Sequence, residues 1–203
     1  MSPRCLMVDV DGVVVHAPDG RRWDADIEAD LGISPQALQE KFFRAHFHDI
    51  VHGRADLFDR LAPALAEFAP HVTAQALVDY WFEKDGRLNH ALLEALAPWR
   101  AAGYALHLAT VQEHHRARHL WEKLALKARF DAIHYAADLG CAKPDPAFWA
   151  AVQQRTGYAP ADLLLIDDSP RNVESARAAG WAAVLWDGTE TLDEVLGKAA
   201  VRL

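Results

Sequence analysis

Short apolar runs alternate with stretches of helical periodicity from Asn89 to the end of the chain, and one further apolar run opens the sequence. Such alternation is typical of βα units, in which buried parallel strands are joined by helices. The runs have the length of fully buried strands. We therefore expect strands at residues 5–10, 105–109, 132–135, 163–166 and 182–186.

Capping residues mark the helix boundaries in the same part of the chain. Asn89 precedes an apolar series of helical spacing, and Asp145 and Ser169 are each followed by a proline, which suits the first helical position. Gly103 and Gly180 stand where helices must end before the next strand. Together these elements predict an α/β fold with a doubly wound parallel-sheet, Rossmann-like core.

The stretch between the first strand and Asn89 has a different character, because it carries helical periodicity and no convincing strand. Ser34, followed by Pro35, and Thr73 are expected helix starts. Pro63 could kink one helix or separate two. The apolar positions with helical spacing are Leu38, Phe42, Ala45, Leu57, Leu61, Leu65, Phe68, Leu77, Val78, Trp81 and Phe82.

These patterns predict a core of residues 1–15 and 89–203 and an inserted all-helical segment, residues 16–88, here called the insertion. It follows the first strand directly, so it should emerge at the carboxyl edge of the sheet. Open α/β folds bind their ligands at that edge. The insertion is therefore expected to act as a lid or specificity cap.

Composition and charge narrow the classes of function. The chain has 203 residues, 51% of them hydrophobic, a formal net charge of -8 and a pI near 5.7. This balance argues against nucleic acid or membrane surfaces as partners. No apolar run approaches the length of a membrane span or signal segment, and Cys5 and Cys141 offer no disulfide framework. We expect a cytoplasmic protein, either a monomer or a homodimer.

Carboxylates follow the first predicted strand. Asp9 could attack phosphorus and form an aspartyl-phosphate, which divides one hard hydrolysis into two easier displacements. Asp11 could protonate the leaving oxygen and afterwards activate water. Gly12 lets the chain turn so that backbone N–H groups face the same phosphate. Taken alone, this pair is also compatible with a helix cap or a solvated turn.

Two further segments supply groups for phosphate. Thr110 and Val111 precede a helix expected near Gln112 or Glu113, so the hydroxyl and backbone N–H groups could hold phosphate oxygens. Lys143 precedes Pro144, which holds it in an extended loop where it could neutralise phosphate and nucleophile together. The alternative for Thr110 is an ordinary helix cap, and the alternative for Lys143 is a surface lysine without a function.

Asp167 and Asp168 end another apolar run and repel each other unless a cation intervenes. Mg2+ prefers a few carboxylates together with water and phosphate oxygens. A zinc site formed by His46, His48 and His52 is disfavoured, since the first two do not share a helix face. His52 and Arg54 in the insertion could reach over the site or belong to a solvated loop.

In this order the segments resemble the haloacid dehalogenase-like hydrolase superfamily, in the C1-type subfamily with a helical cap between the first two motifs. The motifs that carry the resemblance are Asp9-Val10-Asp11-Gly12, Leu108-Ala109-Thr110, Lys143-Pro144-Asp145, and Ile166-Asp167-Asp168-Ser169 with Asn172 and Gly180-Trp181. The resemblance covers nearly the whole chain, weakly in the insertion.

The resemblance implies a role for each matching residue. Asp9 would be the nucleophile, Asp11 the general acid and base, and Thr110 and Lys143 phosphate ligands. Mg2+ would be held by Asp9, the Asp11 carbonyl and Asp168, with Asp167 binding directly or through water. Two positions depart from the family pattern. Val111 stands where relatives often carry a small or polar residue, and Asn172 where they often carry an acid.

We therefore expect a Mg2+-dependent phosphomonoester hydrolase acting on a small phosphorylated metabolite. A phosphomutase would keep every motif and differ in its cap. A 2-haloacid dehalogenase would need neither Asp11 nor the pair Asp167 and Asp168. From another class, a phosphate- or metal-binding signalling module would place its acid pair before its lysine, whereas here the pair follows Lys143.

Overall fold

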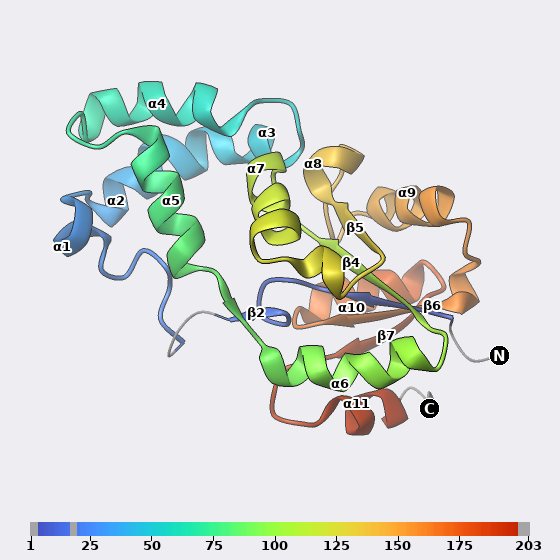
Figure 1. Ribbon diagram of the computed structural model, residues 1–203. Coiled ribbons are helices and arrows are strands. Elements are labelled where there is room, and N and C mark those ends of the chain that lie inside the picture. Colours follow the sequence, from blue (N-terminus) through green and yellow to red (C-terminus); the bar gives the residue numbers. More distant parts are fainter. Residues whose placement is uncertain (1–3, 17–19, 199–203) are drawn as a thin grey trace.

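A five-stranded parallel sheet forms the centre of the protein (Figure 1). The computed structural model describes residues 4–16 and 20–198, so residues 1–3, 17–19 and 199–203 of the predicted domains lie outside the described residues. The order β5-β4-β1-β6-β7 places β1 in the middle, with later strands added first on one side and then on the other. The strands are β1 (Cys5–Val8), β4 (Ala105–Thr110), β5 (Ala132–Tyr135), β6 (Leu163–Asp167) and β7 (Ala182–Leu185).

The strands agree with the sequence pattern to within one residue at each end, except for the first. β1 ends at Val8, two residues before the predicted end at Val10. The Asp9 N–H still bonds to the Ile166 carbonyl across the sheet, at 2.9 Å. Beyond it, the Val10 N–H turns back to the Asp9 carboxylate at 2.7 Å, and this local bond ends the strand.

Helices flank the sheet on both faces. Asn89 caps α6 through the Leu92 N–H, and Asp145 caps α9 through the Ala147 N–H. Ser169 precedes α10 as predicted but makes no side-chain cap bond. The core helices are α6 (His90–Ala101), α7 (His114–Arg118), α8 (Ala136–Leu139), α9 (Pro146–Thr156), α10 (Pro170–Ala178) and α11 (Leu192–Lys198), with shorter η3 (His119–Lys123), η4 (Leu126–Ala128) and η5 (Pro160–Asp162).

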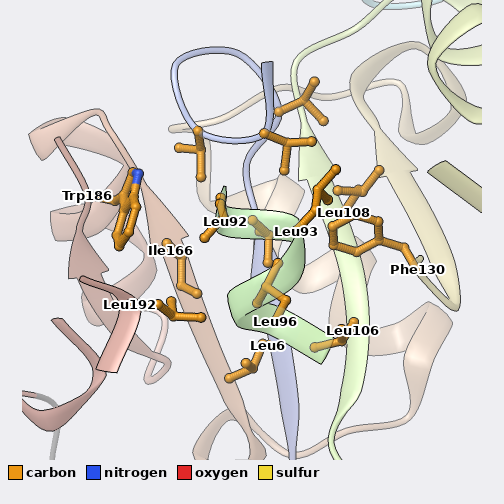
Figure 2. Close-up of a cluster of buried hydrophobic side chains, with 14 of the residues drawn as sticks. Leu6, Leu92, Leu93, Leu96, Leu106, Leu108, Phe130, Ile166, Trp186 and Leu192 are labelled. Atoms are coloured by element: carbon orange, nitrogen blue, oxygen red, sulfur yellow. The ribbon is translucent and has the colours of Figure 1, made fainter. Parts of the chain in front are cut away.

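Alternating strand residues feed two separate apolar layers. Leu6, Leu164 and Ile166 face the layer built with α6 and α11, which Figure 2 shows around Leu92, Leu96 and other residues. Met7 and Leu165 face the opposite layer, built with α9 and α10. This period-two alternation makes a three-layer α/β/α sandwich, as predicted.

The insertion consists of helices that pack around their own apolar cluster. Ser34 and Thr73 cap helices as expected, and Pro63 lies inside one continuous helix, which decides that open question. None of the helices in residues 4–16 and 20–198 has the length and apolar character needed to cross a membrane. The helices of the insertion are α1 (Ile27–Leu31), α2 (Pro35–Leu38), the π-helix η2 (Gln39–Phe47), α3 (His48–Val51), α4 (Leu57–Phe68) and α5 (Ala74–Lys84).

A two-stranded antiparallel ladder joins the insertion to the core. β2 (Val15–His16) pairs with β3 (Arg87–Leu88), and the Asn89 N–H then bonds to the Val14 carbonyl at 2.8 Å. The sequence predicted no strand between the first strand and Asn89, and for these two segments that prediction is wrong. Strands of two residues are too short to show an alternating pattern.

Candidate active site

The predicted carboxylates meet at the carboxyl edge of the sheet, between its two central strands. Val8 is in register with Ile166, so Asp9 after β1 lies beside Asp167 at the end of β6. Asp168 follows in the loop to α10. Asp9, Asp167 and Asp168 each offer an oxygen such that the three atoms lie within 4.8 Å of one another. Strands β4 and β5 are added on one side of β1 and β6 and β7 on the other, so the strand order reverses at β1. Open α/β folds place their ligands at such a point.

Lys143 reaches this cluster from the loop before α9. Its ammonium Nζ lies 2.8 Å from Asp9 Oδ2 and 2.6 Å from Asp167 Oδ2, and its side chain is 1% exposed. The peptide bond between Lys143 and Pro144 is cis. Lys143 lies beside Asp9 as expected, and the alternative of a surface lysine is wrong. The expected extended loop is instead a turn, closed by a hydrogen bond from the Asp145 N–H to the Ala142 carbonyl at 2.9 Å.

Asp167 is fully buried, and hydrogen bonds fix both of its oxygens. Oδ1 accepts from the Ser169 N–H at 2.9 Å and from Asn172 Nδ2 at 3.0 Å, while Oδ2 accepts from Lys143. Asn172 Nδ2 also lies 3.2 Å from Oδ2. An acid at position 172 could not donate these bonds. The departure from the family pattern therefore gives Asp167 a neutral donor in place of a like charge.

The cluster contains more negative charge than Lys143 can balance. Burial raises the pKa of Asp9 to about 8. The positive charge of Lys143 opposes this increase, and the negative charge of Asp167 adds to it. Burial and the charge of Asp167 likewise raise the pKa of Asp168. Burial disfavours the charged form of Lys143, but Asp9 and Asp167 outweigh it and raise its pKa. A further cation would relieve the repulsion among the carboxylates.

The turn after β1 brings Asp11 to the same edge. Gly12 has φ +77°, and a Cβ atom there would lie 2.2 Å from Asp168 Oδ2, so only glycine fits. Asp11 Oδ2 accepts a hydrogen bond from Gln112 Nε2 at 2.6 Å. Burial raises the pKa of Asp11 to about 6, which the nearby positive charge of Arg116 opposes.

Thr110 lies at the carboxyl end of β4, next to β1 in the sheet. It is fully buried, and its hydroxyl Oγ1 has no hydrogen-bond partner in the described structure. A helix cap would require such a partner, but Glu113 caps α7 instead, through the N–H groups of His115 and Arg116. Val111 follows Thr110 and is half-buried. The sequence alternative of a helix cap is therefore wrong for Thr110.

The sequence did not predict Gln112, which bonds to Asp11, or Arg116, whose charge lies near Asp11, as neighbours of the site. Gln112 was considered only as a helix start, although a polar residue two positions after Thr110 was a usable signal. Arg116 carries no such signal, because only folding places its buried side chain near Asp11. In the insertion, His52 Nδ1 bonds to the His48 carbonyl at 2.7 Å, and Arg54 pairs with Asp49 at 2.8 Å. The exposed Arg54 side chain is thus engaged within its own loop.

The chain is similar to proteins of a known family. Residues 3–180 match the model of the haloacid dehalogenase-like hydrolases. The chain belongs to this family. It is therefore an enzyme, a hydrolase. Similar proteins include phosphoglycolate phosphatases from Rhodospirillum rubrum, 31% identical over 90% of this chain and 79% of the relative, and from Mesorhizobium japonicum, 30% identical over 92% and 84%.

Solved structures share the fold of this hydrolase at lower identity. A HAD family enzyme from Bacteroides thetaiotaomicron, in complex with magnesium and inorganic phosphate, is 18% identical with a TM-score of 0.78, covering 95% of this chain and 98% of the other. The L-2-haloacid dehalogenase from Xanthobacter autotrophicus is 20% identical with a TM-score of 0.63, covering 97% and 81%. These structures support the Rossmann-like core with its helical insertion.

Proposed function

We propose that this hydrolase is a Mg2+-dependent phosphatase that cleaves small phosphomonoesters through an aspartyl-phosphate intermediate. One observation carries the proposal: the Asp9 carboxylate is held 2.8 Å from the buried Lys143 ammonium, within a cluster completed by Asp167 and Asp168. A fixed carboxylate beside a cation and a second acidic pair suits attack on phosphorus, where negative charge must be gathered and neutralised.

Asp9 is the proposed nucleophile. Its Oδ1 accepts from the Val10 N–H and its Oδ2 from Lys143, so the side chain has one fixed orientation at the sheet edge. Lys143 in turn is oriented by Asp167. Attack by a carboxylate oxygen forms the P–O bond to Asp9 as the ester oxygen leaves, and water later breaks the acyl-phosphate and regenerates the carboxylate.

Asp11 is the proposed acid and base. The Gln112 amide donates to Oδ2, and we assign proton transfer to the other oxygen, Oδ1. A proton from Asp11 would neutralise the leaving alkoxide, and the resulting carboxylate would then take a proton from the attacking water. Gln112 would hold the carboxylate orientation through both halves of the reaction.

The phosphate is proposed to bind between β1 and β4. The buried Thr110 hydroxyl, which has no protein partner, would donate to one phosphate oxygen. The backbone at Gly12 and Val111 would supply N–H groups, and Lys143 would face the phosphate and Asp9 together. The close approach that Gly12 permits keeps this space free of side chains.

The carboxylates fit a hard divalent cation. Mg2+ takes a few carboxylate oxygens and keeps water and phosphate oxygens as its other ligands. Asp9, the Asp11 carbonyl and Asp168 are the proposed ligands, and Asp168 is the more open of the adjacent pair. Both oxygens of Asp167 already accept protein hydrogen bonds, so we assign it contact through water. Bound Mg2+ would offset the charge that collects on the phosphoryl oxygens.

The proposed substrate is a small phosphorylated metabolite, and the insertion is proposed to be a C1-type helical cap, residues 16–88, that selects it. Two similar proteins carry the name phosphoglycolate phosphatase, which makes 2-phosphoglycolate the first compound to test. The core groups are engaged with phosphate and metal in this proposal, so selectivity must come from the insertion.

An activity screen over phosphorylated metabolites tests the proposal. We expect multiple-turnover release of inorganic phosphate from p-nitrophenyl phosphate and from at least one metabolite. EDTA should abolish it, and added Mg2+ should restore it. Full activity in chelator-treated protein would reject the metal assignment, and release of phosphate from no ester would reject the reaction.

Three measurements separate the alternative functions. A phosphomutase would move the phosphoryl group to another hydroxyl of the same molecule, which ³¹P NMR detects. A 2-haloacid dehalogenase would release halide from 2-chloropropionate without Mg2+. A signalling module would accept one phosphoryl group per chain and then stop, so multiple turnover distinguishes an enzyme from it.

A further inference from the structure

The loop and first turn of α7 connect the candidate site with the insertion. Gln112, in the loop, bonds to Asp11, and Glu113 fixes the turn by accepting from the N–H groups of His115 and Arg116. The side chains of His115 and Arg116 then point to two different acids of the insertion, Asp56 and Asp85. Consecutive residues of one short helix thus contact both the start of α4 and the end of α5.

Arg116 makes the inner of these contacts and is enclosed by the end of α5. Its side chain is 1% exposed, and its Nη1 donates to the Phe82 carbonyl at 3.1 Å. Nη2 donates to the Asp85 carbonyl and lies 3.6 Å from the Asp85 carboxylate. The guanidinium also lies over the Phe82 ring, 5.2 Å from its centroid. It thereby satisfies carbonyls that the helix end leaves without helical partners.

The segment leaving α5, residues 85–88, is here called the return linker. It packs closely at this point: a Cβ atom on Gly86 would lie 2.8 Å from the Phe82 carbonyl oxygen, which Arg116 also binds. The next residue, Arg87, begins β3, which pairs with β2. The Arg116 contacts therefore hold the chain just before it crosses back into the core.

The outer contact is of a different kind. His115 Nε2 lies 2.7 Å from Asp56 Oδ2, but 25% of the His115 side chain and 43% of the Asp56 side chain are exposed. Exposed pairs contribute little because water screens them, whereas a buried guanidinium that loses its partner is left uncompensated. Of the two contacts, that of Arg116 is the stronger constraint on the insertion.

Further contacts tie this region to the catalytic edge. Gly53 of the insertion packs against the core so closely that a Cβ atom there would lie 2.2 Å from the Ala137 carbonyl oxygen. The Ala137 N–H in turn bonds to the Gln112 carbonyl at 3.1 Å. The insertion therefore rests on backbone that also carries the hydrogen-bond partner of Asp11.

We propose that Arg116 is a positioning residue that anchors the return linker to the core and so sets how the insertion sits over the catalytic edge. It acts through the linker and does not touch the substrate. The assignment of a catalytic edge rests on the proposed function, but the anchoring itself does not.

Hydrogen exchange of the intact protein measures the anchoring without any assay of activity. In Arg116→Met, which keeps an unbranched apolar stem but removes the guanidinium with its donors and charge, we expect amides of residues 83–89 to exchange at least tenfold faster. Asp85→Asn should produce a smaller increase in the same peptide, because the carbonyl contacts of Arg116 remain. His115→Gln should leave this peptide within twofold of wild type.

Arg100→Met is the matched control. Arg100 pairs with Asp131 at 2.6 Å within the core and away from the insertion, and its loss should leave exchange at residues 83–89 unchanged. If Arg116→Met does not fold, Arg116→Lys replaces it, since a lysine keeps the charge but cannot reach two carbonyls with the same fork. Exchange within twofold of wild type in the folded Arg116 variant would overturn the proposal.

A kinetic comparison then tests the effect on the site. We expect Arg116→Lys, which keeps the positive charge near Asp11 but not the fork that binds the linker carbonyls, to lower kcat/KM for the preferred metabolite at least tenfold. For p-nitrophenyl phosphate the loss should be less than threefold, because the generic ester uses few contacts with the insertion. Equal losses on both esters would mean that Arg116 only stabilises the fold. If wild type hydrolyses neither ester, the proposed function fails, while the exchange data still decide the anchoring.

Discussion

The contacts of Asp9 allow its charge and its proposed role as nucleophile to be tested separately. Asn at position 9 would keep the side-chain shape but lose the charge that faces Lys143. We expect Asp9→Asn to fold normally, because Asp167 still pairs with Lys143. Turnover should fall by at least about 10³-fold, since an amide cannot form the acyl-phosphate. Steady-state kinetics beside near-UV circular dichroism checks both points, and a loss within tenfold would reject Asp9 as the nucleophile.

Asn172 offers a second test at the same scale, because it donates to both oxygens of buried Asp167. Asn172→Asp removes these bonds and adds a like charge. We expect it to lower the free energy of unfolding by about 2–4 kcal/mol in the absence of Mg2+. Asn172→Ala removes the bonds alone and should cost less. Urea unfolding of both variants gives the difference, and equal costs would show that charge repulsion is unimportant here.

Residue identity alone predicted part of this site. Three acids, Asp9, Asp167 and Asp168, follow the ends of predicted strands, so the strand pattern was enough to expect them together. Lys143 was expected near them because it precedes Pro144. The bond from Gln112 to Asp11 could not be predicted, because it depends on the path of a loop. The predicted carboxylates and Lys143 lie together as the sequence led us to expect. Their catalytic roles stay a prediction.

The turn after β1 shows how one backbone conformation shapes the site. Gly12→Ala puts a methyl group against Asp168 at a φ of +77°, whereas Gly188→Ala meets a φ of +76° with no atom within 4 Å. Both changes cost backbone strain of about 1 kcal/mol or more. We expect only Gly12→Ala to weaken Mg2+ binding as well, by at least tenfold. Titration calorimetry of both variants measures this, and equal affinities would contradict a role for Asp168 in the metal site.

Elements were predictable where their pattern was long enough. The five core strands and the caps at Asn89, Asp145 and Thr73 followed from apolar runs and capping residues. The π-helix η2 was expected only as a helical stretch, because its widened turns depend on packing rather than spacing. The β2–β3 ladder was missed because strands of two residues show no alternating pattern.

At the scale of the whole molecule, a histidine pair formed by buried His134 and half-buried His107 should contribute to acid stability. His107 Nδ1 lies 3.1 Å from His134 Nε2 between β4 and β5, and Nδ1 of His134 has no partner in the described structure. Burial and the neighbouring His107 lower the pKa of His134 to about 4 from 6.5. Arg155 lowers it further, and Asp138 opposes this.

Between pH 6.5 and 4 the unfolded chain therefore binds more protons at this residue, and stability falls as the pH falls through that window. One pKa unit corresponds to about 1.4 kcal/mol, so a shift from 6.5 to about 4 limits the effect to about 3.5 kcal/mol. His134→Gln should lose less unfolding free energy than wild type between pH 7 and 4.5. Equal losses in urea titrations at the two pH values would show that His134 does not titrate as the burial implies.

The β2–β3 ladder also has a consequence for how such a protein can be rebuilt. The insertion leaves and re-enters the core through two neighbouring strands, about 5 Å apart as antiparallel partners are. A graft therefore needs two chain ends at that spacing, together with contacts that replace those of the present insertion with Arg116 and Ala137. The sheet would be spared in such an exchange, because its strands and the residues at its carboxyl edge come from outside the spliced region. One α/β core could in this way carry many different insertions. Under the proposed role of the insertion, recombination would then change the substrate selectivity without stepwise change of the core.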